Sequence, residues 1–386
     1  MKEERKRILK MVEDGKLSVD EALTLLEGLE KAGNNMEQPA GGQNIESAST
    51  IKFEEVKKEP EASVKFEEVK KEEYGYDKFQ AVKDRVFDFV DTALKKVKDL
   101  DLDFNFGQSV AIRHIFQQRE ADINKIDIDL ANGAVQVIPW DENEVRIQCD
   151  AMVYRVENED EARSKFLQEA IFSVEGQKLR LAVQQKWMKV ETIVSIPREQ
   201  YDSIKIRLFN GPIQTGHLNV KDFKAKTANG KIKLEGLNTE KLEAETGHGA
   251  IDVKGSKARE IELETLHGAI KSEGDFAIAD LQSVNGNITC TLHNQDCETI
   301  EAKTATGSIE LIIPAAASAS GNLKSNLGGF TVDLKDITVV EEKNEMVQKM
   351  MRFKPLVENQ KQIRLYADTK TGSIYVRNSA GVSLEK

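Results

Sequence analysis

Aromatic residues are scarce in this sequence: they make up 6% of its 386 residues, and the mean hydropathy is −0.47. This composition indicates a soluble protein with lean hydrophobic cores. No apolar run comes near the ~20 residues that a helix needs to cross a bilayer. The N-terminal sequence MKEERKRILKMVEDGK carries charges where a signal peptide has its apolar region. We therefore expect a cytoplasmic chain without a membrane-spanning domain.

Cysteine and positive charge are also limited. The three cysteines, Cys149, Cys290 and Cys297, are odd in number and form no CxxC pair. Neither a disulfide framework nor a zinc site is indicated, and we expect reduced thiols. The formal net charge is −11, whereas broad nucleic-acid binding needs a basic surface. We therefore expect no nucleic-acid partner, and contact with an anionic membrane would need a local basic patch.

Motifs of the common catalytic sites are missing. There is no GxSxG elbow and no HExxH helix, and no GxxxxGK[ST] or GxGxxG loop leads into a helix. Only five histidines are present in the whole chain. We therefore expect a protein that is not an enzyme and holds no cofactor, and we assign no catalytic, cofactor-binding or metal-binding residue.

Residues 1–33 predict a short helical hairpin. The Asp14-Gly15-Lys16 turn separates two segments, and residues 18–21 match the capping box of the second helix. Apolar residues recur at helical spacing in both segments: Ile8, Leu9, Val12, Ala22, Leu25, Leu26 and Leu29. The hairpin is smaller than the ~40 residues below which isolated domains usually need outside help. We expect it to self-associate or to bind a partner, with packing on the rest of the chain as the alternative.

Residues 34–77 predict a flexible charged linker, rich in Gly, Ser, Pro, Glu and Lys. The sequence IKFEEVKKE at 51–59 returns as VKFEEVKKE at 64–72. Mixed charge with few apolar groups cannot offset the entropy of ordering the chain. A transient helix is the alternative.

Residues 78–106 predict an amphipathic helix. Its apolar residues are spaced three or four apart: Phe79, Val82, Val86, Val90, Ala93, Val97 and Leu100. Lys95, Lys96 and Lys98 form a basic cluster, so residues 78–100 could lie on a membrane surface. Four aspartates within the same residues would be repelled by anionic lipid. We therefore favour packing on the following β-domain or on a partner helix, with peripheral membrane contact as the alternative.

A repeat of about twenty residues dominates residues 223–332. Its pattern is [ST]-x-x-G-x-[IF], with glycines at steps of 19, 19, 18, 21 and 21: Gly230, Gly249, Gly268, Gly286, Gly307 and Gly328. Apolar residues alternate on both sides of each glycine, as in strands with one buried face. A unit of two short strands cannot bury that face alone, so neighbouring units must stack. We therefore predict a mainly β, parallel β-solenoid or β-helix-like domain over residues 122–386.

Outward charges favour stacking in register. Lys233, Asp252 and Lys271 occupy one position in successive units, so neighbouring strands would carry opposite charges. The pattern is imperfect, because Glu245 and Glu264 would face each other. The same register predicts one interior column: Ile232, Ile251, Ile270, Ile288 and Ile309.

Two histidines, His248 and His267, precede the glycine in adjacent units, where stacking could form a metal pair. Other units have asparagine or threonine at this position, such as Asn229. Asparagine and histidine tolerate the left-handed backbone of tight corners. We therefore interpret the column as structural.

Acids such as Glu262, Glu264 and Glu301 fall on outward positions, where a solvated charge is the ordinary explanation. A glycan-cleaving β-helix would need clustered acids in a groove, which stacked outward acids could form. A glycan-cleaving enzyme is thus the catalytic alternative.

Two segments interrupt the strands. Residues 158–170 predict a helix, and residues 344–360 form a methionine-rich insertion. We interpret the insertion as a cap of the solenoid, with an adaptable contact surface as the alternative.

Taken in order, these segments resemble a known family. Residues 1–33, which include EERKRILKMVEDGKLSVDEALTLLEGLE, resemble the SHOCT-like hairpin. Residues 122–386, with IDIDLANGAVQVIPW, VSIPRE and the T-x-x-G-x-I ladder, resemble the toastrack β-strand-repeat domain of YvlB-type proteins of Gram-positive bacteria. The resemblance implies no catalytic residues. It implies a link to cell-envelope stress, because toastrack domains are associated with phage-shock-type membrane proteins such as those with PspC domains.

We therefore expect a cytoplasmic, non-enzymatic scaffold or sensor linked to the envelope stress response. Its expected partner is a protein such as a PspC-type membrane protein, which would recruit it to the inner face of the cell membrane. The alternative is an adhesin-like or carbohydrate-binding β-solenoid.

Overall fold

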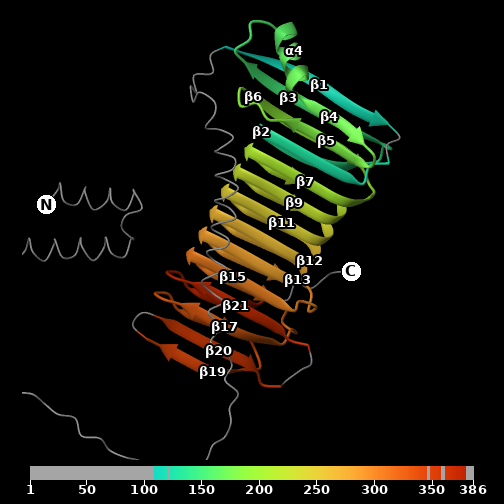
Figure 1. Cartoon of the computed structure of the whole chain (residues 1–386). Coiled ribbons are helices and arrows are strands. Elements are labelled where there is room, and N and C mark those ends of the chain that lie inside the picture. Colours follow the sequence, from blue (N-terminus) through green and yellow to red (C-terminus); the bar gives the residue numbers. More distant parts are fainter. Residues whose placement is uncertain (1–107, 120–121, 346–347, 358–360, 380–386) are drawn as a thin grey trace, which may run out of the picture. The chain divides into compact units, whose positions relative to one another are not determined.

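The computed structural model describes residues 108–119, 122–345, 348–357 and 361–379, which form a stack of two-stranded coils (Figure 1). The predicted hairpin at 1–33, the linker at 34–77 and the helix at 78–106 lie outside the described residues. Parallel strands joined in register connect each coil to the next. The predicted mainly β, solenoid-like fold class is confirmed.

One side of the stack, called face 1, is a nearly continuous parallel sheet, because each coil contributes its first strand to it. In spatial order these strands are β5 (Lys178–Val183), the first half of β2 (Lys125–Trp140), β7 (Gln200–Asn210), β9 (Asn219–Asn229), β11 (Asn238–His248), the second halves of β12 (Ile251–His267) and β13 (Ile270–Asn285), β15 (Thr299–Thr306), β21 (Ile363–Thr369) and β17 (Ala319–Ser325).

The opposite side, called face 2, contains the second strand of each coil. In spatial order these are β6 (Met188–Pro197), the second half of β2, β8 (Ile213–Thr215), β10 (Ile232–Glu235), the first halves of β12 and β13, β14 (Ile288–Leu292), β16 (Ile309–Ile313), β22 (Ile374–Asn378) and β18 (Phe330–Asp333).

The core lies between the two faces and consists of the inward side chains of both. Strand alternation points every second residue inward, and the predicted isoleucine column is confirmed. Ile251 pairs with Ile232 and Ile270, and Ile288 with Ile270 and Ile309. All five side chains are fully buried. The expected charge alternation is also confirmed for Lys233, Asp252 and Lys271, which are neighbours in register on face 2.

Antiparallel strands close both ends of the stack. At one end β3 (Glu144–Tyr154) pairs with β6, β1 (Ser109–Arg119) pairs with β3, and β4 (Ile171–Glu175) pairs with β5. At the other end β20 (Lys349–Pro355) pairs with β17, and β19 (Ile337–Asn344) pairs with β20. Since β20 carries the methionine-rich insertion, this pairing supports its interpretation as a cap.

A single α-helix, α4 (Glu159–Glu169), belongs to the described residues and packs on β1 and β3. Asn158 caps it by accepting a hydrogen bond of 2.9 Å from the Glu161 backbone N–H. The helix expected over residues 158–170 is confirmed. In the part of the chain that the structure describes, no helix is both long and apolar enough to cross a membrane.

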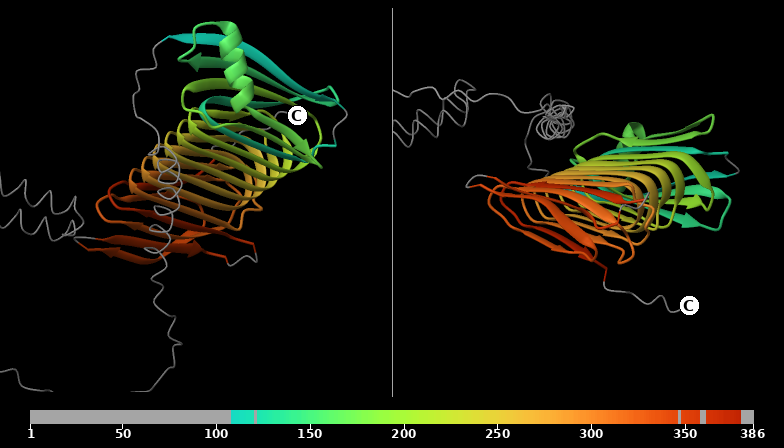
Figure 2. Two further views of the ribbon diagram at one scale, coloured as in Figure 1. Left: turned by 45° about the horizontal axis from the view of Figure 1, so that its top comes forward. Right: turned by 90° about the horizontal axis from the view of Figure 1, so that it is seen from below.

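Two coils lie out of chain order. The β2 coil lies between the β5–β6 and β7–β8 coils, and the β21–β22 coil lies between those of β15–β16 and β17–β18 (Figure 2). The corner glycines follow this order, so Gly372 contacts both Gly307 and Gly328. Between β18 and β21 the chain forms β19 and β20, which pair antiparallel and add no further coil.

Candidate functional site

The T-x-x-G corner is built by hydrogen bonds between neighbouring coils. The Thr265 hydroxyl donates to the carbonyl oxygen of Gly249 at 3.0 Å, and Thr246 donates to Gly230 at the same distance. Five other units repeat the bond, from the hydroxyls of Thr227, Ser283, Thr304, Thr369 and Ser325. A Cβ atom on Gly268 would lie 1.9 Å from the Gly249 oxygen, so the coils stack too closely for any side chain there. The repeated motif is thus explained by stacking and not by catalysis.

The column that precedes these glycines is held by its own side chains. The Asn229 amide donates to the Asn210 amide oxygen at 2.8 Å, and the rings of His248 and His267 stack with centroids 4.9 Å apart. The expected left-handed backbone is wrong for this column, since none of its described asparagine, histidine or threonine residues has a positive φ; in some units the following glycine has one, as at Gly249 (158°). No cluster of three or more His, Cys, Asp or Glu side chains able to hold a metal occurs among the described residues. The two imidazoles therefore have no third ligand in this part of the chain.

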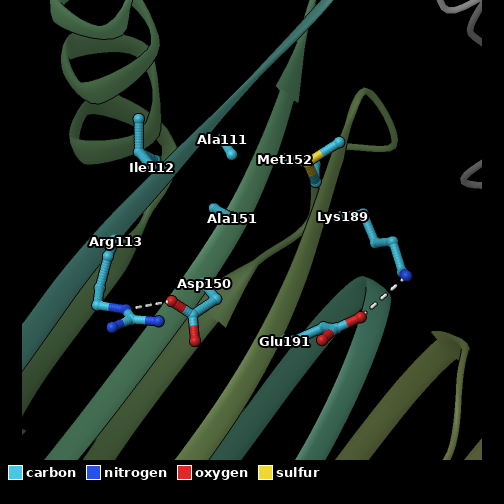
Figure 3. Close-up of a pocket in the computed structure, with 8 residues that line it drawn as sticks. All are labelled: Ala111, Ile112, Arg113, Asp150, Ala151, Met152, Lys189 and Glu191. Atoms are coloured by element: carbon cyan, nitrogen blue, oxygen red, sulfur yellow. Dashed lines mark hydrogen bonds and ion pairs between the residues drawn. The ribbon is translucent and has the colours of Figure 1, made fainter.

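A hollow of about 520 Å³ lies on the outer surface of β1, β3 and β6 (Figure 3). Arg113 donates to Asp150 at 2.5 Å, and Lys189 donates to Glu191 at 2.9 Å. Asp150 and Glu191 lie opposite each other in the antiparallel register. The lining residues are Ala111, Ile112, Arg113, Asp150, Ala151, Met152, Lys189 and Glu191.

The charges in this hollow do not suit acid–base catalysis. Hydrogen bonds from Arg113 and then Gln148 hold the pKa of Asp150 below its usual range. Glycoside hydrolysis needs one carboxylic acid that stays protonated, which requires a raised pKa. Each carboxylate instead has a cation beside it, and both ion pairs are largely open to water. The hollow is therefore a water-exposed surface of apolar and ion-paired side chains.

The three thiols are buried in the core. Burial raises the pKa of Cys149 and Cys297 to about 12 and that of Cys290 to about 11. A thiol of this kind stays protonated at neutral pH and is a poor nucleophile. All three cysteines are free and buried in the structure.

The acids singled out in the sequence lie in two neighbouring rows on the outer surface of face 1. The first, called the carboxylate row, contains four successive acids in register: Glu243, Glu262, Asp280 and Glu301. The second, called the buried polar row, contains Lys226, Glu245, Glu264, Gln282 and Lys303. Glu264 is only 1% exposed. The expectation of a solvated charge at this position is therefore wrong.

Sequence reasoning missed the buried polar row as a group. Strand alternation places its residues on the outer surface, which predicts contact with water. A signal was nevertheless present, because the residue directly before the Ser or Thr of each of these units is polar. Within the row Lys226 forms an ion pair with Glu245, and Lys303 pairs with Glu301 of the adjacent carboxylate row.

Family models match two parts of the chain. The model of the toastrack family, DUF4097, matches residues 123–353, and that of the SHOCT-like domain matches residues 3–34. The chain is also 44% identical over 385 residues to the protein described as uncharacterized protein YvlB of Bacillus subtilis (strain 168). This match covers 98% of the chain and 100% of that relative.

Solved structures with a similar fold share little sequence with the chain. A candidate adhesin from Bacteroides fragilis is 14% identical with a TM-score of 0.41, over 69% of this chain and 97% of that one. A candidate lipid-binding protein from Parabacteroides distasonis is 13% identical with a TM-score of 0.27, over 69% and 95%. These values are too low to carry an argument about function.

Proposed function

Because the chain belongs to the toastrack family, we propose that it is a non-enzymatic scaffold or sensor that binds a protein partner at the inner face of the cell membrane. The partner that we propose is a PspC-type membrane protein, and the process is the cell-envelope stress response. The relative from Bacillus subtilis is itself uncharacterised. Support for a binding role must therefore come from the surfaces of this chain.

The observation that carries the proposal is the ordered row of polar side chains on face 2. Successive strands, about 4.8 Å apart, present these residues in register: Gln214, Lys233, Asp252, Lys271, Thr289, Glu310 and Tyr375. The parallel pairing holds the backbone of each position in place, so little backbone entropy is lost when a partner binds. Charges of both signs alternate along the row, which favours a protein surface of complementary pattern over an anionic lipid surface.

The described residues support binding more than catalysis. The carboxylates of the hollow on β1, β3 and β6 are ion-paired, and the thiols remain protonated. Stacked coils also give a stiff, extended surface, which repeat proteins use for recognition. These features fit a scaffold whose specificity lies in its pattern of outward charges.

A charge-reversed variant on face 2 tests the proposal. Lys233→Glu/Lys271→Glu places three acids side by side, with Asp252 between the two new ones, while Lys335→Glu changes an exposed residue that is not part of the row. We expect the full chain to retain a PspC-type protein from envelope-stressed cells, the double variant to lose at least fivefold of it, and Lys335→Glu to retain it. Equal retention by all three chains would contradict binding through face 2, and a glycan array bound only by the unchanged chain would favour the carbohydrate-binding alternative.

Residues 1–33 enter the proposal as the self-association segment, and light scattering tests that part separately. Deleting residues 1–33 should lower the mass of the particle, because the predicted hairpin is too small to fold alone and is expected to associate with a second copy. The melting temperature of the β-domain should not change. An unchanged mass would remove this role from the segment.

A further inference from the structure

The β1 strand, which ends the sheet of face 2, has one unpaired edge. It pairs with β3 over eleven consecutive residues, from Ser109 opposite Tyr154 to Arg119 opposite Glu144 (Figure 1). Among the described residues no second strand pairs with β1. The outer edge of β1 is therefore an edge of the sheet.

The hydrogen bonds to β3 determine which backbone groups of β1 point to this edge. The Arg155 N–H donates to the carbonyl oxygen of Gln108, one residue before β1, at 3.1 Å. Bonded and non-bonded positions alternate in an antiparallel pair, so the even-numbered residues of β1 bond to β3. The odd-numbered residues direct their backbone N–H and C=O groups to the unpaired edge: Ser109, Ala111, Arg113, Ile115, Gln117 and Arg119.

Side chains bond to two carbonyl oxygens of this edge. Arg163 of α4 donates to the Arg113 oxygen at 3.2 Å, and Gln118 donates to the Arg119 oxygen at 3.3 Å. Within the described part of the chain, the other backbone groups of this edge form no hydrogen bond to protein. A row of unpaired N–H and C=O groups is a template on which another strand can pair.

The other strands at the ends of the stack are protected in ways that β1 is not. β4 and β18 are only five and four residues long. β19 contains a bulge between Val339 and Glu341, and three of its eight residues are charged. Proteins use short strands, bulges and charges to keep sheet edges from pairing. β1 is longer, follows β3 without a bulge and contains no proline, lysine or acidic residue.

The charges of β1 are compatible with a second, identical edge. Arg113 forms an ion pair with Asp150 of β3, and Arg119 forms one with Glu144 of β3. Burial, and then the charge of Arg163, lower the pKa of His114, so this imidazole is neutral at neutral pH. The edge therefore carries little net charge.

We propose that the unpaired edge of β1 binds the β1 strand of a second copy of the chain, antiparallel and about a twofold axis at His114. The two sheets would then join into one continuous sheet. This inference is independent of the partner proposed for face 2 and of the self-association proposed for residues 1–33.

Pairing about His114 uses the whole length of the strand. Each of the six odd-numbered residues then lies opposite an odd-numbered residue of the second copy, which gives about twelve backbone hydrogen bonds between the copies. A typical protein interface has about ten hydrogen bonds. A twofold interface of this kind is closed, so association stops at two copies.

The same register joins compatible side chains. On the side of the sheet that α4 covers, Ile112 lies opposite Phe116 of the second copy, which is a favourable apolar cross-strand pair. On the other side Arg113 lies opposite Ile115 of the second copy. No two arginines lie directly opposite each other, so the register avoids the repulsion of like charges.

Pairing exchanges one contact of the present edge. The Arg113 oxygen would accept a hydrogen bond from the Ile115 N–H of the second copy in place of the bond from Arg163. The Arg163 side chain is 41% exposed, so water can replace what its guanidinium group loses. Arg163→Ala should therefore leave the association intact.

Cysteine cross-linking of the full chain tests the proposal. In the variant Ala111→Cys/Gln117→Cys, the two cysteines lie about 20 Å apart within one copy but directly opposite each other between copies, with Cα atoms about 5.5 Å apart. A disulfide needs Cα atoms within about 7 Å. We expect a disulfide-linked dimer on mild oxidation, detected by non-reducing electrophoresis. The three native thiols are buried and do not compete.

Two controls separate edge pairing from chance contact. Ser109→Cys/Gln117→Cys places the cysteines one step out of register, with Cα atoms about 9 Å apart, and should give at least about tenfold less linked dimer. Ile115→Pro, added to Ala111→Cys/Gln117→Cys, removes an N–H of the unpaired edge and should also reduce linkage at least about tenfold. Ile115→Thr keeps that N–H and should keep the linkage. Neither change at Ile115 removes a hydrogen bond to β3, so thermal melting should show that both variants fold.

Three results would overturn the inference. The first is no linked dimer from Ala111→Cys/Gln117→Cys, which is also the result if the copies associate through residues 1–33 alone. The second is equal linkage in Ser109→Cys/Gln117→Cys, because chance contact would then explain both. The third is slow amide exchange at Ile115 in a chain that stays monomeric, because another segment of the same chain would then pair with the edge.

Discussion

Ile270→Asp is the strongest perturbation of the interior column. Ile270 is fully buried in register between Ile251 and Ile288. The substitution replaces an apolar contact on both sides with a carboxyl group. No cation lies inside the column to pair with it, because its other members are also isoleucines.

The expected cost has two parts. Losing the buried isoleucine side chain costs about 2 kcal/mol. A carboxyl group in an apolar interior has its pKa raised by about 3 units, which at about 1.4 kcal/mol per unit adds about 4 kcal/mol at neutral pH. The sum of about 6 kcal/mol approaches the whole stability of many domains. We therefore expect Ile270→Asp to unfold or to melt far below the unchanged protein.

Urea denaturation followed by circular dichroism measures this cost against two controls. Ile270→Val should cost about 1 kcal/mol, because it removes one methyl group. Lys271→Asp changes the next residue, which points to water beside Asp252, and should cost at most about 1 kcal/mol. A soluble Ile270→Asp protein with an unchanged midpoint would refute the buried column.

Three further substitutions test single contacts. Thr265→Val removes the hydroxyl that donates to the next coil and should cost about 1 to 2 kcal/mol by urea denaturation; an unchanged midpoint would count against the corner bond. Gly268→Ala should cost more than about 3 kcal/mol because its Cβ meets a backbone oxygen, whereas Gly329→Ala, with nothing within 4 Å, should cost less than about 0.5 kcal/mol, and equal costs would contradict the close stacking. Burial raises the pKa of the Asp368 carboxyl group in the folded protein above its value in the unfolded chain. The folded state therefore loses stability as pH rises from the unfolded pKa to the folded pKa, and it carries no such loss below the unfolded pKa. Asp368→Asn should therefore raise the melting temperature at pH 7 and not at pH 3, and a lower melting temperature at both would show that this reasoning is wrong.

The coil and its interior were predictable because one short pattern specifies them locally. A hydroxyl, a glycine three residues later and an apolar residue after it define the corner. Alternation then decides which side chains point inward. The isoleucine column and the charge neighbours Lys233 and Asp252 follow from that register alone.

The order of the coils could not be predicted from the same pattern. Each unit presents an equivalent strand edge, so the repeat does not specify which units are neighbours in the stack. The units of Gly328 and Gly372 exchange places because β19 and β20 fold back against β17 and leave its other edge for β21. The antiparallel pairing of β1 with β3 likewise depends on contacts distant in sequence.

The burial of Glu264 was unpredictable for another reason. Alternation correctly places it outside the core, and an outward glutamate ordinarily contacts water. Its exposure depends on the neighbours that stacking places beside it, Glu245 and Gln282, which no local pattern encodes. The acids Glu262 and Glu301 share a row for the same non-local reason, since Asp280 of β13 lies between them.

Stacking order decides which outward side chains are neighbours on a face, so the proposed binding surface depends on it. Cysteine cross-linking measures it directly: neighbouring strands are about 4.8 Å apart and second neighbours about 9.6 Å, while a disulfide needs Cα atoms within about 7 Å. Glu310 and Tyr375 are neighbours in register, and Thr331 lies beyond Tyr375. Glu310→Cys/Tyr375→Cys should therefore form a disulfide on mild oxidation and Glu310→Cys/Thr331→Cys should not. A disulfide in the second variant and none in the first would contradict the order of the stack.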